Sequence, residues 1–187
     1  MQIRESKLIY DGWTRFLILD VESPDGHRMT RAVLDHGESA CVLPYDSTRR
    51  TALLVAQQRV PQLYLGQPES SLEAIAGRLE PDEAVEESIS REAEEEAGLR
   101  LHGLEPVATC WASPGVSTER IHLYLAAYSP ADRTGPGGGR AEELENIEVK
   151  EMALSELARR ADQGSITDAK TMLLIQTLRL RRPHLFA

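Results

Sequence analysis

Three glutamates, Glu92, Glu95 and Glu96, lie close together in a stretch with the sequence pattern of a helix. At 3.6 residues per turn, their carboxylates share one face of that helix. Like charges three and four residues apart repel each other by roughly a few tenths of a kcal/mol, so a bound cation would stabilise this face. Carboxylate oxygens suit Mg²⁺ or Mn²⁺, and Mg²⁺ is commonly held by one or two carboxylates together with substrate phosphates. The three glutamates therefore predict a divalent-cation site for phosphate chemistry.

The alternative is a solvated helix face whose charge only keeps the protein in solution. The charge is local, however. Residues 77–99 contain nine carboxylates and two arginines, whereas the whole chain of 187 residues carries a net charge of −9. Outside this stretch the chain is almost balanced, which favours a specific purpose for the acidic segment.

The acidic segment has helix signals at both ends. Asp82 follows Pro81 and is predicted as the N-cap, and Gly98 is predicted as the residue that ends the helix. Between them apolar residues recur every four positions and predict a narrow buried stripe. The stripe consists of Val85, Ile89, Ala93 and Ala97.

The elements around this helix follow from strand and turn signals. The segment 8–22 is predicted as a strand that the turn SPDG (23–26) connects to a return strand over 27–34. The segments 60–70 and 129–145 are predicted as loops. Further strands are predicted at 39–44, 51–60, 71–76, 105–112, 120–128 and 146–152, and further helices at 155–162 and 168–180. This mixed order of strands and helices indicates an α/β or α+β fold.

Composition excludes several classes of function. The pI near 5.1 argues against binding nucleic acid through its phosphates, which requires a basic face. The first thirty residues contain no uninterrupted apolar run of the kind that a secretory signal needs. The longest apolar run, 123–128, is far shorter than a membrane span. We therefore expect a cytoplasmic protein without a membrane or nucleic-acid partner.

The acidic segment also matches a known motif, GX5EX7REUXEEXGU, in which U is apolar. Seven fixed identities would occur by chance at a given start with a probability on the order of 10⁻⁸. The matching residues are Gly77, Glu83, Arg91, Glu92, Ala93, Glu95, Glu96, Gly98 and Leu99. This motif is the Nudix box, and the chain resembles the Nudix hydrolases. The resemblance implies an α/β Nudix fold, with mixed β-sheets sandwiched between helices, over residues 39–187, preceded by an N-terminal β extension over residues 1–38.

The resemblance implies a metal site on this helix. Glu92 and Glu96 would bind the metal directly, and Glu95 would contribute to catalysis through a water or a second ion. The carbonyl of Ala76 would complete the shell of ligands. The implied cofactor is Mg²⁺, and Mn²⁺ also suits these ligands.

Four further residues of the motif would support that site. Arg91 and Glu83 would pair with each other and hold the carboxylates in place. Gly77 would allow a tight backbone turn, and Gly98 would end the helix.

Residues outside the motif resemble the ADP-ribose and nucleotide-sugar pyrophosphatase branch of the family. These are EAIAG (73–77), SPGVSTE (113–119) and the acidic loop 142–145. Two further stretches, GGGRAEELENIEV (137–149) and GSITDAKTMLL (164–174), look most similar to the GDP-mannose hydrolases of that branch.

In this branch a glutamate on the loop before the last strand takes the proton of the attacking water. Glu143 is the first candidate for this base and Glu145 the second; the alternative is that both belong to a solvated loop. The triple glycine at 137–139 lacks the lysine of a phosphate-binding P-loop, so we interpret it as a hinge.

The same resemblance implies four contacts with substrate. Arg59 would bind the diphosphate, Glu73 would lie near the ribose, and Glu119 and Lys170 would surround the sugar or base. Surface ion pairs are the alternative for each of these residues.

Together these residues predict a Mg²⁺-dependent pyrophosphatase of nucleoside diphosphate sugars, which releases a nucleoside monophosphate and a sugar phosphate. ADP-ribose and GDP-mannose are the two candidate substrates. The N-terminal β extension is too small to bury its own faces, so we expect it to exchange between the subunits of a homodimer. The alternatives are a non-catalytic sensor of nucleotide sugars and a housecleaning hydrolase of other nucleoside diphosphate derivatives.

Overall fold

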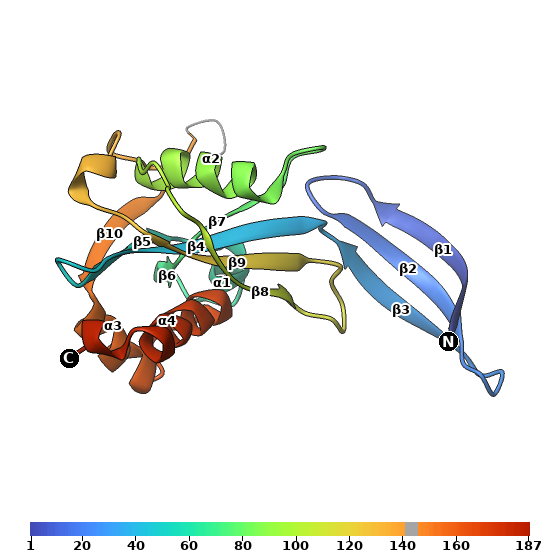
Figure 1. The fold of residues 1–187 in the computed structure, drawn as a ribbon. Coiled ribbons are helices and arrows are strands. Elements are labelled where there is room, and N and C mark those ends of the chain that lie inside the picture. The colour runs from blue at the N-terminus through green and yellow to red at the C-terminus, as the bar shows by residue number, and fades with distance from the viewer. Residues whose placement is uncertain (141–145) are drawn as a thin grey trace. The chain divides into compact units, whose positions relative to one another are not determined.

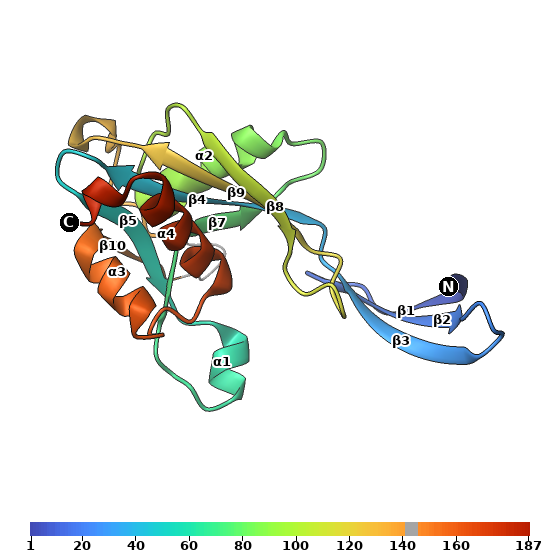
Figure 2. The same ribbon diagram turned by 60° about the horizontal axis from the view of Figure 1, so that its bottom comes forward.

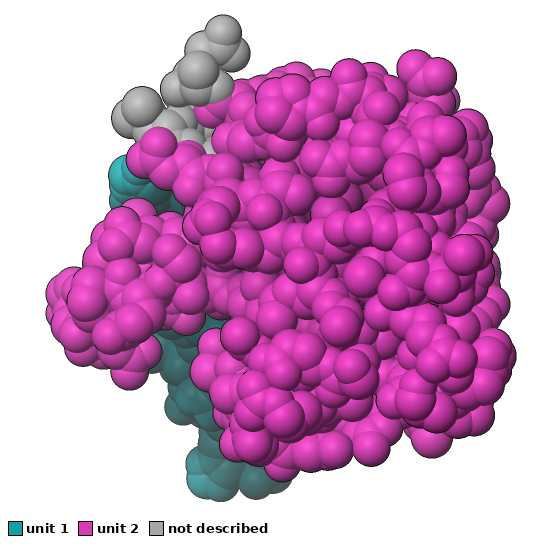
Figure 3. Space-filling model, turned by 90° about the vertical axis from the view of Figure 1, so that its left-hand side faces the viewer, with its two compact units in different colours: residues 1–39, 109–121 teal, residues 40–108, 122–187 magenta. Residues whose placement is uncertain are grey.

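The computed structural model describes residues 1–140 and 146–187. The chain forms two compact units, one of residues 1–39 and 109–121, the other of residues 40–108 and 122–187. Figure 3 colours the two units separately.

The first unit contains an antiparallel sheet of three strands in the order β1-β2-β3. The strands are β1 (Gln2–Tyr10), β2 (Arg15–Glu22) and β3 (Arg28–Asp35). The prediction of one strand over 8–22 is wrong, because the chain turns at the Asp11-Gly12 pair, a strong turn signal. The predicted turn over 23–26 is confirmed, since Gly26 N–H donates to the Ser23 carbonyl over 3.0 Å.

The larger sheet has the strand order β10-β5-β4-β9-β8, with β6 paired to β5 and β7 paired to β4. Its strands are β4 (Glu38–Asp46), β5 (Thr51–Gln57), β6 (Ser71–Glu73), β7 (Ile75–Arg78), β8 (Glu105–Trp111), β9 (Arg120–Ala127) and β10 (Glu148–Ala153). Helix α2 (Val85–Ala97) covers one face of this sheet, and α3 (Leu154–Asp162) and α4 (Ala169–Arg181) cover the other (Figures 1 and 2). The predicted α/β fold with a sheet between helices is confirmed.

The core beneath α2 consists of the predicted helix stripe and alternate residues of the sheet. Ile89, Ala93 and Ala97 pack in one buried cluster with Val42 and Leu53. The intervening residues of β4 are buried too, so this central strand is covered on both faces, as the layers of helices require. The stripe therefore fixes which face of α2 points away from the sheet.

Three local predictions are corrected by the structure. Helix α1 (Val60–Tyr64) interrupts the predicted loop 60–70, with Pro61 in its first turn, where a missing N–H costs nothing. Asp82 is not the N-cap of α2: it adopts a φ of 63°, and the helix starts after Ala84. The predicted strand 71–76 is two strands, β6 and β7, because the chain changes its partner strand at Ala74.

The remaining helices are short. The 3-10 helices are η1 (Pro130–Asp132) and η3 (Pro183–Leu185). Gly98 ends α2 as predicted, with a φ of 56° in the left-handed region. In the described parts of the chain, every helix is too short or too polar to cross a membrane.

Candidate active site

Two carboxylates of α2 converge on strand β7. Ala76 N–H donates a hydrogen bond to Glu96 Oε2 over 3.2 Å, and Glu96 is only 3% exposed. The Glu92 carboxylate lies directly against Gly77, since a Cβ on that glycine would stand 1.9 Å from Glu92 Oε1. Gly77 is therefore needed here for the close approach of the Glu92 side chain.

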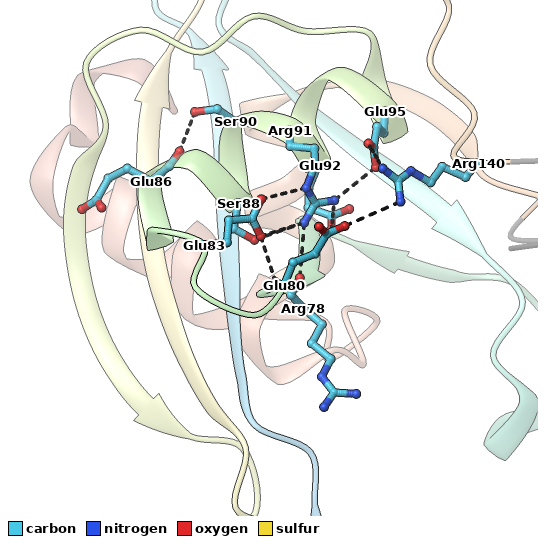
Figure 4. A network of polar contacts seen from close by, with 10 residues as sticks. All are labelled: Arg78, Glu80, Glu83, Glu86, Ser88, Ser90, Arg91, Glu92, Glu95 and Arg140. Atoms are coloured by element: carbon cyan, nitrogen blue, oxygen red, sulfur yellow. Dashed lines mark hydrogen bonds and ion pairs between the residues drawn. The ribbon is translucent and has the colours of Figure 1, made fainter. Parts of the chain in front are cut away.

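Arg91 ties the carboxylates of α2 together (Figure 4). Its Nε donates to Glu83 Oε1 over 2.8 Å, and its Nη1 donates to Glu92 Oε1 over 2.8 Å and to Glu95 Oε2 over 3.2 Å. The hydrogen bond from Arg91 is the main reason that the pKa of Glu83 falls to about 2. We refer to these four residues together with Glu96 as the acidic cluster.

A second cation reaches the acidic cluster from the glycine-rich segment. Arg140 Nη2 lies 2.8 Å from Glu95 Oε1 (Figure 4). The N–H groups of Gly138 and Gly139 donate to the carbonyls of Glu96 and Glu95 over 2.8 and 3.0 Å. These bonds satisfy carbonyls that the end of a helix leaves without partners. The structure thus places the triple glycine against the last turn of α2; its role as a hinge stays a prediction.

The donor set of this site suits a divalent cation. Glu92 and Glu96 present carboxylate oxygens to the same two residues of β7, and carboxylates with a backbone carbonyl are the ligands that Mg²⁺ and Mn²⁺ prefer. Within residues 1–140 and 146–187, no three acidic, histidine or cysteine side chains already stand as a metal cage. Instead, arginines neutralise Glu92 and Glu95.

A separate group of charges surrounds Glu73, the last residue of β6. Arg59 donates to both carboxylate oxygens of Glu73, over 2.9 and 2.8 Å. Lys170 Nζ lies 2.7 Å from Glu73 Oε2 and 2.7 Å from Asp168 Oδ1. We call these four residues the Glu73 cluster. The structure thus brings together three of the four predicted substrate contacts.

The carboxylate at the centre of the Glu73 cluster is nearly buried. The Glu73 side chain is 5% exposed and that of Lys170 is 17% exposed. Burial raises the pKa of Glu73, but hydrogen bonds and charge from Arg59 and Lys170 outweigh it and hold this pKa at about 2. Burial likewise lowers the pKa of Lys170, and the neighbouring Glu73 carboxylate reverses this and raises it. Both groups are therefore ionised at neutral pH.

The other predicted site residues do not join these clusters in the described chain. Glu119 belongs to the unit of residues 1–39 and 109–121, where it accepts a hydrogen bond from Ser39 Oγ over 2.9 Å. Glu143 and Glu145 lie outside the described residues. A cavity of about 420 Å³ contains none of the predicted site residues; it is lined by Ala56, Ser70, Leu72, Glu148, Lys150, Met152 and Arg160.

Sequence reasoning missed two residues of the Glu73 region. Asp168 caps α4 by accepting the N–H of Thr171 over 2.9 Å, and Thr171 is fully buried. The signal was present, because an aspartate three residues before a threonine at the start of an apolar helix is a capping pattern. What the pattern could not reveal is that the Thr171 hydroxyl accepts the N–H of Ala74, between β6 and β7.

Comparison with known proteins now identifies the family. The model of the NUDIX domain matches residues 35–174. The chain belongs to the Nudix family. Both the resemblance of residues 77–99 and the predicted fold are confirmed by this match, and Nudix hydrolases generally use divalent metal ions.

Three relatives of this chain share the name GDP-mannose pyrophosphatase. A protein of Cronobacter sakazakii named GDP-mannose pyrophosphatase is 44% identical over 170 residues, which cover 89% of this chain and 87% of the relative. A GDP-mannose pyrophosphatase of Pectobacterium atrosepticum is 37% identical over 182 residues, with 94% and 92% coverage. A third, from Salmonella arizonae, is 39% identical over 154 residues, with 82% and 79% coverage.

Proposed function

We propose that this protein hydrolyses GDP-mannose to GMP and mannose 1-phosphate with Mg²⁺ as its cofactor. At the level of class, a nucleoside diphosphate sugar pyrophosphatase is confirmed by the Nudix match and the relatives. The observation that carries the proposal furthest is the convergence of Glu92 and Glu96 on Ala76 and Gly77 of β7. The names of the relatives support GDP-mannose over ADP-ribose.

In this proposal the acidic cluster holds the metal. Glu92, Glu96 and the carbonyl of Ala76 would be the ligands, and Glu95 would assist through a water or a second ion. Bound Mg²⁺ would neutralise the charge that develops on the diphosphate and orient a water for attack on phosphorus. Arg91 would hold Glu92 and Glu95 in position, as its present hydrogen bonds to both support.

The water's proton needs an acceptor, for which we propose Glu143, with Glu145 as the second candidate. They lie three and five residues after Arg140 in the chain. Arg140, the last described residue before both glutamates, contacts Glu95 of the acidic cluster. In this proposal the carboxylate would act as a general base on the attacking water.

The Glu73 cluster supplies the binding side of the proposal. The Arg59 side chain is 39% exposed although its Nε and Nη2 both donate to Glu73, so part of this cationic side chain can be reached from solvent. Lys170 and Glu73 would contact the sugar and the ribose. The role of Glu119 at the sugar or base stays a prediction.

The direct test of the substrate is a comparison of initial rates with Mg²⁺ across GDP-mannose, ADP-ribose and other nucleotide sugars. The proposal expects GDP-mannose to give the highest kcat/KM. Higher kcat/KM for ADP-ribose would contradict the substrate but leave the class intact. Binding of a nucleotide sugar without turnover would indicate the non-catalytic sensor, and turnover of other nucleoside diphosphate derivatives alone would indicate a housecleaning hydrolase.

We also propose that the protein is a homodimer whose N-terminal extension exchanges between subunits. A cytoplasmic location stays a prediction. All nine residues of β1 are exposed, and the apolar side chains of Ile3, Ile9, Tyr10 and Trp13 are between 49% and 77% exposed. An exposed edge strand of this kind favours pairing with another chain. Sedimentation equilibrium at micromolar concentration should give twice the chain mass of 20.8 kDa, and a monomer would contradict the proposal.

A further inference from the structure

The chain changes its partner strand at Ala74. β6, which ends at Glu73, pairs with β5, whereas β7, which starts at Ile75, pairs with β4. Ala74 lies between the two strands and is 1% exposed. A buried N–H at such a switch needs a partner from another element. That partner is the Thr171 hydroxyl of α4, which accepts the hydrogen bond over 2.6 Å.

Asp168 fixes the orientation of the Thr171 hydroxyl. The hydroxyl donates its own proton to Asp168 Oδ2, which also accepts Thr171 N–H over 2.9 Å. Because the single hydroxyl proton is directed at Asp168, a lone pair of the oxygen remains for Ala74 N–H. Thr171 is 0% exposed, so water cannot easily take over either bond.

The same turn of α4 holds the preceding residue as well. Lys170 Nζ bonds to Glu73 Oε2 and to Asp168 Oδ1, each over 2.7 Å. Residue 73 is thus held through its side chain and residue 74 through its backbone. The first turn of α4 acts as a clamp on the junction between β6 and β7.

This junction leads directly to the acidic cluster. Two residues beyond Ala74, Ala76 N–H bonds to Glu96, and the next residue, Gly77, lies against the carboxylate of Glu92. A shift of the backbone at Ala74 would therefore move the strand on which both carboxylates converge.

We propose that Thr171 is a positioning residue: through Ala74 N–H it sets the position of β7, and thereby the affinity of the acidic cluster for a divalent metal. The inference rests on the metal site of the proposed function. It assigns a role to the stretch GSITDAKTMLL (164–174), which supplies no ligand to the proposed metal site.

The test compares Thr171→Val with Thr171→Ser. Valine keeps nearly the same volume without an acceptor, whereas serine keeps the hydroxyl. The readout is the Kd for Mn²⁺, measured without substrate from the electron paramagnetic resonance signal of the free ion. We expect Thr171→Val to raise this Kd about tenfold, the range seen when groups behind a metal ligand are removed, and Thr171→Ser to stay within about twofold of the wild type.

A matched control separates positioning from stability. Ile175→Val removes one methylene from a residue of the same helix that is 1% exposed and should lower the unfolding temperature without changing the Kd for Mn²⁺. In steady-state assays, saturating Mg²⁺ should restore kcat in Thr171→Val. If the valine variant does not fold, Thr171→Ala, which also lacks the acceptor, is measured and interpreted in the same way.

The outcomes distinguish this inference from the proposed function. A wild-type Kd for Mn²⁺ in Thr171→Val, or an equal loss in Thr171→Ser, would overturn the inference alone. Mn²⁺ binding by the wild type without cleavage of any nucleotide sugar would overturn the proposed function alone. A wild type that does not bind Mn²⁺ would overturn both.

Discussion

The acidic cluster and the Glu73 cluster are both made of carboxylates and cations, but they are assembled in opposite ways. The acidic cluster comes from residues 83–96 of one helix and its preceding turn, and its carboxylates are 14–23% exposed where they pair with Arg91. The Glu73 cluster joins residue 59 at the start of α1, residue 73 at the end of β6 and residues 168 and 170 at the start of α4, and Glu73 is 5% exposed. The first is set by helical periodicity, the second by tertiary packing.

This difference predicts different consequences of mutation. The acidic cluster has an excess of carboxylates, so removing one should cost metal binding and turnover rather than folding. In the Glu73 cluster the charges are paired around the nearly buried Glu73, so removing that carboxylate leaves Arg59 and Lys170 without its compensating charge. Turnover should therefore depend most on the first cluster and folding most on the second.

The largest effect is expected for Glu96→Gln. Loss of a carboxylate ligand should lower kcat by about a thousandfold, since a metal contributes several kcal/mol to the transition state. Glu94→Gln on the exposed side of the same helix is the matched control and should keep kcat. Steady-state kinetics with Mg²⁺ and circular dichroism of both variants check this. Normal turnover in Glu96→Gln would contradict the assignment of the metal site.

Glu73→Gln should instead destabilise the fold by about 3 kcal/mol, because Lys170 and Arg59 lose a buried partner. The pKa of Glu73 in the folded protein, about 2, lies below its ordinary value of 4.5. Its contribution is therefore fully present above pH 4.5 and is lost as the pH falls towards 2. Urea unfolding at pH 7 and pH 3 should show the difference between wild type and variant shrinking at the lower pH.

Glu156 provides the control for burial. Its pKa also falls to about 2 through Arg159 and Arg160, but its side chain is 32% exposed. Glu156→Gln should therefore cost much less stability than Glu73→Gln at pH 7. Equal losses of stability in the two variants would mean that burial of an ion pair does not decide its contribution to stability.

Gly77→Ala tests the approach of α2 to β7. The added Cβ would stand 1.9 Å from the Glu92 carboxylate, which can move away at little cost in stability. We expect about tenfold weaker Mn²⁺ binding, with little change in the unfolding temperature. Gly115→Ala, where a Cβ meets nothing within 4 Å, is the control. Unchanged Mn²⁺ binding in Gly77→Ala would show that the position of Glu92 does not matter for the metal.

The smallest effect is expected for Arg140→Gln. In the proposed function Arg140 would compete with a metal ion for Glu95, and its side chain is 39% exposed. Removing this ion pair should therefore tighten Mn²⁺ binding by about twofold to threefold, within the range of exposed ion pairs. Weaker Mn²⁺ binding in the variant, measured by isothermal titration, would mean that Arg140 supports the metal site rather than competing for it.

The acidic cluster could be predicted from the sequence because its geometry follows from the spacing of residues along one helix. The helix stripe, the end at Gly98 and the shared face of Glu92, Glu95 and Glu96 all follow from a period of 3.6 residues. The start of the helix did not follow: Asp82 is a favourable N-cap by residue type, yet Glu83 turns back to bond Glu80 N–H and Arg91, and α2 begins after this turn.

The Glu73 cluster could be predicted only as separate residues. The family resemblance indicated Arg59, Glu73 and Lys170 as substrate contacts. No local pattern, however, indicates that Lys170 contacts Glu73, which lies 97 residues earlier in the chain. Asp168 and Thr171 carry a local capping signal, and the contact of Thr171 with Ala74 depends on the change of partner strand. Such a switch is a property of the sheet, not of the segment.

In the proposed function, a divalent metal held by the acidic cluster would promote cleavage of the diphosphate of GDP-mannose. The most direct measurement is ³¹P nuclear magnetic resonance of the wild-type protein with GDP-mannose, with Mg²⁺ and with excess chelator. We predict the resonances of GMP and mannose 1-phosphate with Mg²⁺ and unchanged GDP-mannose with the chelator. Release of GDP, or the same rate with the chelator, would contradict metal-dependent cleavage of the diphosphate.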